Sequence, residues 1–233
     1  MMDFHTHILP GVDDGSRNAE QSLQMLELMR KQGIRRIIAT PHFYANDESV
    51  DSFISRRNKA FKMLKELNKD GPEIIPGAEV KFYSGISHME NLEKLRIEGS
   101  RLLLLEMPFS QWGESDIKEI IDMAGRGKFT LVLAHIERYI SMQKKGVIQR
   151  LLDNGILIQS NASFFEGFFS RSKAIKMLRN NQIQFIGSDC HNLTDRAPDL
   201  GKAFSAIESK CGKAFLSEFV NYGNELFLQN ISN

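Results

Sequence analysis

The chain has 233 residues, 42% of them hydrophobic and 25% charged, a composition that excludes a disordered or fibrous protein. Its 30 basic and 29 acidic side chains leave a net charge of +1, which argues against a general nucleic-acid-binding protein. No apolar run reaches the roughly 18 residues that cross a membrane, and two cysteines are too few for a disulfide framework. We therefore expect one cytoplasmic domain over residues 1–233, with no nucleic-acid partner and no membrane insertion.

Short apolar runs alternate with longer amphipathic segments along the chain, a pattern that predicts strands separated by helices. The predicted strands are residues 1–5, 36–40, 74–78, 102–106, 130–135, 156–160 and 184–187. The first helix is predicted to begin after Asn18, which is placed as an N-cap with Gln21 three residues later. The later helices are predicted at about 51–68, 115–125, 144–154, 172–180, 198–210 and 214–228.

Strands that alternate with crossover helices favour a parallel sheet, because each parallel pairing needs a long connection. Seven such units predict an α/β fold of the (β/α) barrel type, distorted and one unit short of eight. A doubly wound open sheet is the alternative, since periodicity alone does not distinguish the two architectures.

Polar side chains that bind metals gather at the ends of these predicted strands. They are His5, His7, His42, Glu79, Glu106, His135, Asp189 and His191. The carboxyl ends of parallel strands share one edge, where barrel enzymes assemble their sites. Carboxylates that converge there would repel one another unless cations neutralise them, and imidazole with carboxylate is a ligand set for Zn, Mn or Fe. The pattern predicts a multinuclear metal site, whereas each residue alone has an ordinary hydrogen-bonding explanation.

Two further residues have two interpretations each. Asp14 could add a ligand for a third metal, or the Asp-Asp-Gly segment could be a turn that caps the next helix. Arg138 follows His135 by three residues, and its guanidinium would offer paired donors to a phosphate. The alternative for Arg138 is an ion pair with Glu137 or with another carboxylate at this edge.

The segment from Cys190 to Arg196 matches the Cys-x5-Arg pattern of cysteine-dependent tyrosine phosphatases. That chemistry needs a thiolate surrounded by backbone N–H groups, usually with glycines that permit close approach. This loop has no glycine and contains Asp195, whose charge would oppose a phosphate. We interpret the match as a coincidence.

Taken in order, the motifs resemble those of the PHP (polymerase and histidinol phosphatase) superfamily. The opening His-Thr-His-Ile-Leu-Pro-Gly-Val-Asp-Asp-Gly is similar to one branch, the manganese-dependent protein-tyrosine phosphatases of bacterial capsular and exopolysaccharide operons. The segments Ala-Thr-Pro-His42, Pro-Gly-Ala-Glu79 and Ser-Asp-Cys-His191 also resemble that branch. The resemblance extends from Met1 to about Gly201. One departure is His135-Ile-Glu-Arg138, where the family usually has proline at the second position.

The resemblance implies a distorted seven-stranded barrel of PHP type, with two to three divalent metals at the C-terminal strand ends. Mn is the usual assignment, and Fe and Zn are alternatives. The implied ligands are His5, His7, Asp14, His42, Glu79, Glu106, His135, Asp189 and His191. Glu79 is the implied bridge, and Arg138 is implied to bind the phosphoryl group. His191 is also the candidate for a general acid.

The implied activity is hydrolysis of phosphotyrosine in a protein, through a hydroxide that the metals activate. The implied substrate is an autophosphorylating bacterial tyrosine kinase that controls capsular or exopolysaccharide synthesis. A phosphatase for histidinol phosphate or another small phosphomonoester is the nearest alternative, followed by a metal-dependent nuclease. Aromatic residues after the strand ends, including those within 164–169, could line a phosphotyrosine site or could be ordinary loop packing. The sequence does not indicate an oligomeric state.

Overall fold

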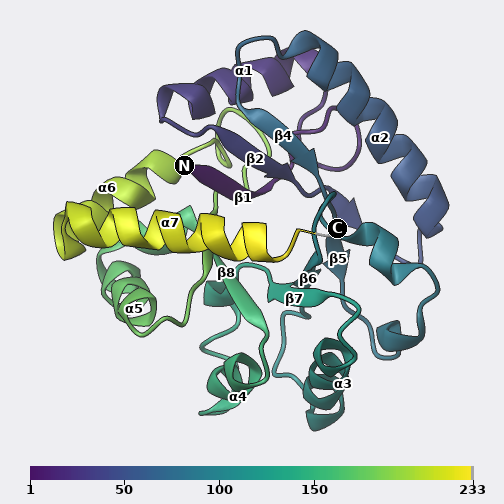
Figure 1. Ribbon diagram of the computed structural model, residues 1–233, viewed down its shortest axis with the longest axis vertical. Coiled ribbons are helices and arrows are strands. Elements are labelled where there is room, and N and C mark those ends of the chain that lie inside the picture. Colours follow the sequence, from purple (N-terminus) through teal and green to yellow (C-terminus); the bar gives the residue numbers. More distant parts are fainter. Residues whose placement is uncertain (232–233) are drawn as a thin grey trace.

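The computed structural model describes residues 1–231, which form an α/β fold of parallel strands with surrounding helices (Figure 1). The strands are β1 (Met2–Thr6), β2 (Arg36–Ala39), β3 (His42–Phe43), β4 (Glu73–Pro76), β5 (Glu79–Lys81), β6 (Leu102–Glu106), β7 (Thr130–Leu133), β8 (Leu157–Asn161) and β9 (Phe185–Gly187). The helices are α1 (Ala19–Lys31), α2 (Val50–Leu67), α3 (Glu114–Gly125), α4 (Val147–Asp153), α5 (Phe168–Arg179), α6 (Leu200–Cys211) and α7 (Lys213–Gln229). Short 3-10 turns, η1 (Ile86–His88), η2 (Leu92–Leu95), η3 (Ile136–Arg138) and η4 (Ala162–Phe165), complete the connections.

Every pair of neighbouring strands is parallel, as the alternation of strands and helices predicts. The strand orders are β1-β2-β4 in one sheet and β3-β5-β6-β7-β8-β9 in the other. At the C-terminal ends of β1 and β9, the N–H of Asp189 donates to the carbonyl of His5 at 2.8 Å, and the N–H of His7 donates to the carbonyl of Cys190 at 3.0 Å. These bonds connect the last strand to the first.

Nine strand segments are present among residues 1–231, because the short strands β3 and β5 follow the predicted strands at 36–40 and 74–78 after a break. The break between β2 and β3 includes Pro41, which has no N–H for a ladder bond. The break between β4 and β5 includes Gly77, where a Cβ would lie 3.1 Å from the Ile97 side chain. After both breaks the strands pair again with His42 opposite Glu79, so the interruptions bring two polar residues side by side.

The helices begin and end close to their predicted positions. The Asn18 side chain accepts a hydrogen bond from the N–H of Gln21 at 2.9 Å, which confirms the predicted N-cap of α1. Helix α5 begins at Phe168, four residues before the predicted start at 172, and α4 begins at Val147 after the left-handed Gly146. None of the helices within residues 1–231 combines the length and the apolar character that a membrane span needs.

The core has two parts, one between the strands and the outer helices and one inside the curve of the strands. The inner part contains Phe4, Leu104 and Phe185, together with Leu226 and Phe227 of α7. Figure 1 shows α7 lying across the strands. Asn230, after the end of α7, accepts hydrogen bonds from the N–H of Arg101, just before β6, and from the hydroxyl of Thr130, at the start of β7. Helix α7 therefore covers the N-terminal ends of the strands and leaves their C-terminal ends for the polar residues.

Candidate metal centre

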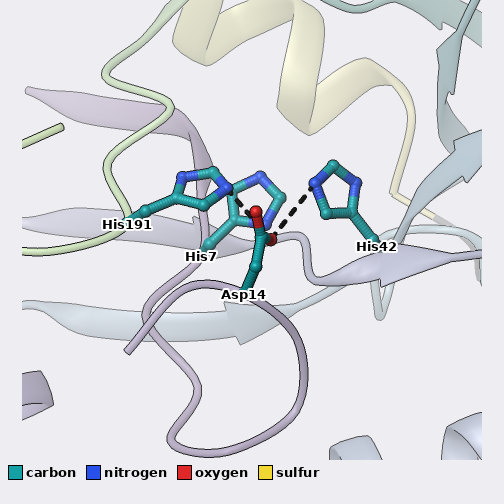
Figure 2. A group of neighbouring side chains, drawn as sticks. All are labelled: His7, Asp14, His42 and His191. Carbon is teal, nitrogen blue, oxygen red and sulfur yellow. Dashed lines mark ion pairs between the residues drawn. The ribbon is translucent and has the colours of Figure 1, made fainter. Parts of the chain in front are cut away.

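The polar residues predicted from the strand ends come together in the structure. They form three overlapping groups in which the potential ligand atoms lie within 4.8 Å of one another. The groups are His7, Asp14, His42 and His191; His5, His7 and Asp189; and His42, Glu79 and Glu106. Figure 2 shows the first group, with Asp14 between the imidazoles of His42 and His191. His88, the one histidine placed outside the predicted site, is exposed and lies on η1.

Glu79 lies at the centre of the site and is 1% exposed. Its Oε2 is 3.1 Å from His5 Nε2, 3.3 Å from His7 Nε2 and 3.0 Å from His42 Nδ1, and its Oε1 is 2.8 Å from His135 Nε2. Burial opposes ionisation of this carboxyl, but the charge of His5 and the hydrogen bond from His135 hold its pKa well below the usual range. His135, which belongs to none of the three groups, therefore reaches the site through Glu79 and through Glu106, whose Oε1 is 3.5 Å away.

Hydrogen bonds at the outer edge of the imidazoles fix the way in which they face the centre. His7 Nδ1 is 2.6 Å from the Asp13 carboxylate, and His5 Nδ1 is 3.3 Å from Gln159 Oε1. Both partners are acceptors, so each Nδ1 carries a proton, and each Nε2 offers a lone pair to a metal when the imidazole is neutral. His5 Nε2 and His7 Nε2 are only 3.0 Å apart. Two lone pairs at this separation repel each other, and a cation between them would turn the repulsion into coordination.

Two buried atoms of the site have no hydrogen-bond partner among the described residues, Glu79 Oε2 and His191 Nε2. An unpaired buried polar atom is costly, and a metal ligand is one of the few reasons to keep it. His191 Nδ1 lies 2.9 Å from the carbonyl oxygen of Asp189, so its proton is also directed away from the centre. Imidazole and carboxylate donors with this arrangement fit divalent transition-metal ions.

The two aspartates of the Asp-Asp-Gly segment have different surroundings. Asp14 faces the metal-binding imidazoles, whereas Asp13 supports His7. Asp14 is 66% exposed, and its Oδ1 is 3.5 Å from His42 Nε2 and 3.4 Å from His191 Nε2. The Asp13 side chain is 5% exposed and accepts hydrogen bonds from His7 Nδ1 and from the N–H groups of His42 and Gly15. Burial of Asp13 opposes ionisation, but the neighbouring His7 lowers its pKa below the ordinary value. The sequence analysis missed this residue as a partner of His7, and only its place beside Asp14 signalled it.

A buried chain of side-chain amides links three parts of the site, and the sequence analysis missed it as well. Gln159 Oε1 accepts from the backbone N–H of His135 at 2.6 Å, and its Nε2 donates to Asn161 Oδ1 at 3.0 Å. Asn161 Nδ2 then donates to Asp189 Oδ2 at 2.8 Å. The backbone N–H can only donate and the carboxylate can only accept, so the direction of the whole chain is fixed from both ends. Polar residues at the end of an otherwise apolar strand, β8, were the available signal.

Two arginines hold the Asp189 carboxylate. Arg138 Nη2 is 2.5 Å from Asp189 Oδ2, and Arg196 Nη2 is 2.7 Å from Asp189 Oδ1. The ion pair considered as the alternative for Arg138 is therefore the contact that the structure contains, with Asp189 as the carboxylate. Both guanidiniums remain about one-third exposed, so they border the site rather than being enclosed in it. Sequence reasoning considered Arg196 only within the Cys-x5-Arg match.

Cys190 does not have the environment of a reactive thiolate. Its side chain is fully buried, and burial raises the pKa of the thiol well above its ordinary value. Arg196 binds Asp189 in this arrangement, with no phosphate loop around the sulfur. The structure supports the interpretation of this motif as a coincidence.

His191 is 2% exposed and has charged neighbours. Burial, together with the charges of His7 and Arg196, lowers the pKa of His191 to about 4. A neutral imidazole is the form that binds a cation, and with its single proton on Nδ1 it has no proton on Nε2 to donate as a general acid. The geometry thus favours the metal-binding assignment of His191 over the acid role.

The aromatic residues near the strand ends divide into packed and exposed ones. Phe43, Trp112, Phe164 and Phe165 are buried, as the packing interpretation predicts. Tyr44 is partly exposed and stacks on His42 with ring centres 5.4 Å apart. Phe109 is 54% exposed, with its ring 6.2 Å from that of His135 and with Lys81 and Arg138 over its face. Tyr44 and Phe109 are therefore two exposed aromatic side chains that flank the site.

Comparison with known proteins identifies the family. A family described as "Capsular polysaccharide synthesis, CpsB/CapC" matches residues 1–230. The tyrosine-protein phosphatase YwqE of Bacillus subtilis is 28% identical over 99% of this chain and 92% of its own length. The tyrosine-protein phosphatase CpsB of Streptococcus agalactiae is 29% identical over 99% of this chain and 96% of its own length.

Solved structures agree with this assignment. A chain from the crystal structures of YwqE from B. subtilis and CpsB from Streptococcus pneumoniae, described as unique metal-dependent tyrosine phosphatases, superposes with a TM-score of 0.83. It is 25% identical, and the match covers 100% of this chain and 96% of the other. The histidinol phosphate phosphatase of Lactococcus lactis, at 13% identity and a TM-score of 0.58, shares the fold over 90% of this chain and 93% of its own. The predicted resemblance is thus confirmed, and the chain belongs to the CpsB/CapC family of capsular polysaccharide synthesis.

Proposed function

We propose that this protein is a metal-dependent protein-tyrosine phosphatase. The observation that carries the proposal is the Glu79 carboxylate, which faces four imidazoles while the Nε2 atoms of His5 and His7 confront each other at 3.0 Å. The relatives named tyrosine-protein phosphatases, and the metal dependence attributed to the solved YwqE and CpsB structures, support the same activity.

The residues that would hold two to three divalent ions are His5, His7, Asp14, His42, Glu79, Glu106, His135, Asp189 and His191. Mn is the proposed metal, with Fe and Zn as alternatives. When bound, such ions activate water as a nucleophile and neutralise the charge of a phosphoryl group. The Nδ1 atoms of His5, His7 and His191 face hydrogen-bond acceptors outside the centre, which leaves their Nε2 atoms for coordination.

Arg138 is the proposed phosphoryl-binding residue, and Arg196 reaches the same carboxylate from the other side. A guanidinium offers two parallel donors that match two oxygens of a phosphate, and it keeps its charge at all relevant pH values. Phe109 lies below the Arg138 guanidinium at 5.7 Å and presents an exposed face where a phosphotyrosine ring could pack. A tyrosine leaving group has a pKa of about 10, so its departure needs less help from a proton donor than the departure of an alkoxide does.

The fold proposed to carry this activity is a single-domain, distorted seven-stranded barrel in which β2 with β3, and β4 with β5, count as interrupted strands. The metal centre lies at the C-terminal strand ends. The proposed substrate is a phosphotyrosine protein, an autophosphorylating bacterial tyrosine kinase that controls capsular or exopolysaccharide synthesis, and the proposed location is the cytoplasm. Histidinol phosphate is the alternative substrate to test. The histidinol phosphate phosphatase of L. lactis shares the fold, and a shared fold alone does not distinguish the two substrates.

The testing experiment measures phosphate release from a phosphotyrosine peptide and from histidinol phosphate. Each reaction is run with Mn, with a chelator and after thiol alkylation. We expect release that needs metal, resists alkylation and favours the peptide. His42→Gln should abolish it, whereas the exposed His88→Gln is the matched control and should retain it. Preference for histidinol phosphate, or activity that survives chelation, would contradict the proposal.

A further inference from the structure

Two adjacent phenylalanines are unusually exposed at the start of α5. Phe168 is 84% exposed and Phe169 is 89% exposed, and their rings contact each other edge to face at 5.4 Å. The neighbouring Phe164 and Phe165 are buried, so the exposure is particular to this pair. Leaving two large apolar rings in water is unfavourable, and such a patch is typical of an interaction site.

The same helix carries only positive charge. Its charged residues are Arg171, Lys173, Lys176 and Arg179, and it contains no acidic residue. None of these four forms an ion pair with a carboxylate in the part of the chain that the structure describes. Such a local excess stands out in a protein whose net charge is +1. The helix therefore presents aromatic rings and unneutralised cations together.

Two of the cations border a hollow of about 350 Å³ beside the first phenylalanine. The hollow is lined by Phe168, Arg171, Ser172, Ile175, Arg179 and Lys210. Arg171 donates to the carbonyls of Phe165 and Glu166, and Arg179 donates to the carbonyl of Lys210, so both guanidiniums are held in place. A site whose cations are already fixed loses little side-chain freedom when an anion binds.

The chain path places this helix at the edge of the metal centre. Strand β8 ends at Asn161, which donates to Asp189 at the site. The turn η4 follows directly, and α5 begins after Gly167. In a parallel β/α unit the helix starts on the side where the strand ends, so the two phenylalanines lie on the same side of the molecule as the metal centre.

We propose that Phe168, Phe169, Lys173, Lys176 and Arg179, here called the α5 surface, dock an acidic, tyrosine-containing segment of the phosphoprotein substrate. This inference rests on the proposed function and names a contact outside the phosphotyrosine that is cleaved. Carboxylates of the segment would meet the cations, and its aromatic side chains would pack on the exposed rings.

A peptide suits the α5 surface better than a lipid bilayer does. The apolar side of α5, with Ala174, Ile175 and Leu178, is buried against the core and is not available to lie on a membrane. Beyond the two rings, the exposed residues of the helix are polar or cationic. A helix that lies in a membrane interface needs a continuous apolar face, which α5 does not present.

The test compares a Phe168→Ser/Phe169→Ser variant and a Lys173→Gln/Lys176→Gln variant with the wild type. Substrates are a phosphotyrosine peptide flanked by glutamate and tyrosine, the same peptide with serine at the flanking positions, and para-nitrophenyl phosphate. We expect KM for the acidic peptide to rise about tenfold in each variant, with kcat unchanged. Kinetics on para-nitrophenyl phosphate should not change, because that substrate has no flanking residues.

The matched control removes equivalent groups from α2, where Lys62, Met63 and Lys65 are exposed. Met63→Ser and Lys62→Gln/Lys65→Gln should leave all kinetics as in the wild type. An unchanged KM for the acidic peptide in the α5 variants would overturn the docking inference. An equal loss on all three substrates would also overturn it, because it would indicate a folding defect. Loss of binding to anionic lipid vesicles without a change in peptide KM would assign the surface to membranes instead. Absence of turnover by the wild type would contradict the proposed function itself.

Discussion

Gln159→Leu removes a buried amide that joins three parts of the metal centre and replaces it with an apolar side chain of similar size. Gln159 is fully buried, and its amide contacts His5 Nδ1, the N–H of His135 and Asn161 Oδ1. Leucine leaves the N–H and the amide oxygen without partners, at about 1–3 kcal/mol each, partly offset by its greater apolar surface. We expect the free energy of unfolding to fall by about 3 kcal/mol.

The same substitution should weaken metal binding. Without Gln159 Oε1, the proton of His5 is no longer held on Nδ1, and the imidazole can rotate or change tautomer. Loss of such an outer partner typically lowers metal affinity about 10–100-fold. Gln159→Glu keeps the acceptor for both N–H groups, so it should restore most of that affinity. This difference between two variants at one position separates orientation of His5 from general stability.

The assay combines thermal unfolding with metal content. For a chain of this size, 3 kcal/mol corresponds to a fall in Tm of about 6–12 °C in the metal-free protein. Metal affinity is measured by titrating Mn into metal-free protein, with the exposed Gln149→Leu as the matched control. Unchanged Mn affinity in Gln159→Leu, or equal loss in the Leu and Glu variants, would refute the reasoning.

Three other changes test separate parts of the structure. Arg138→Ala should reduce phosphatase turnover more than about tenfold while metal content stays the same, and unchanged turnover would remove Arg138 from phosphoryl binding. Phe227→Ala removes a ring from the inner core and should destabilise by about 3–5 kcal/mol in urea unfolding, whereas a loss below about 1 kcal/mol would contradict the packing. Burial and contact with Glu166 raise the pKa of Asp199 to about 7. The unfolded carboxyl ionises first as pH rises, so stability falls between about pH 4 and pH 7. Asp199→Asn should therefore be more stable than the wild type at pH 8 by about 1–2 kcal/mol, after allowance for partial exposure, and equal to it near pH 3.5. A pH-independent difference in urea unfolding would contradict this.

The sequence predicts the strand positions and the convergence of the polar residues because both follow from local patterns. An apolar run ends at Glu106 or at His135, and parallel strands bring such ends to one edge. The strand breaks near Pro41 and Gly77 were not predicted, because they depend on contacts with other strands and with Ile97. A local sequence pattern does not show which distant side chain will contact a given residue in the folded chain.

The outer partners of the site were missed for the same reason. Asp13 and Asp14 are adjacent and identical in type, and only the fold decides that one supports His7 while the other faces His42. Gln159 is signalled only by the polar end of β8, and neither it nor Arg196 has a local pattern that names its partner, His135 or Asp189. Residues that bind metals can be identified in a sequence by their side-chain chemistry. The residues that orient them can be identified only from their contacts in the structure.

The charges around the centre identify the carboxylate that most needs a metal. Glu106 has Lys81 Nζ at 2.9 Å, and Asp189 has two guanidiniums. Glu79 has only imidazoles around it, and those of His5 and His7 must be neutral to bind a metal through Nε2. A buried carboxylate without a compensating charge is strongly unfavourable, so cations supplied from solution would stabilise Glu79 more than either neighbour. Its two oxygens face different groups of imidazoles, Oε2 toward His5, His7 and His42 and Oε1 toward His135. This division favours Glu79 as the residue shared between two ions.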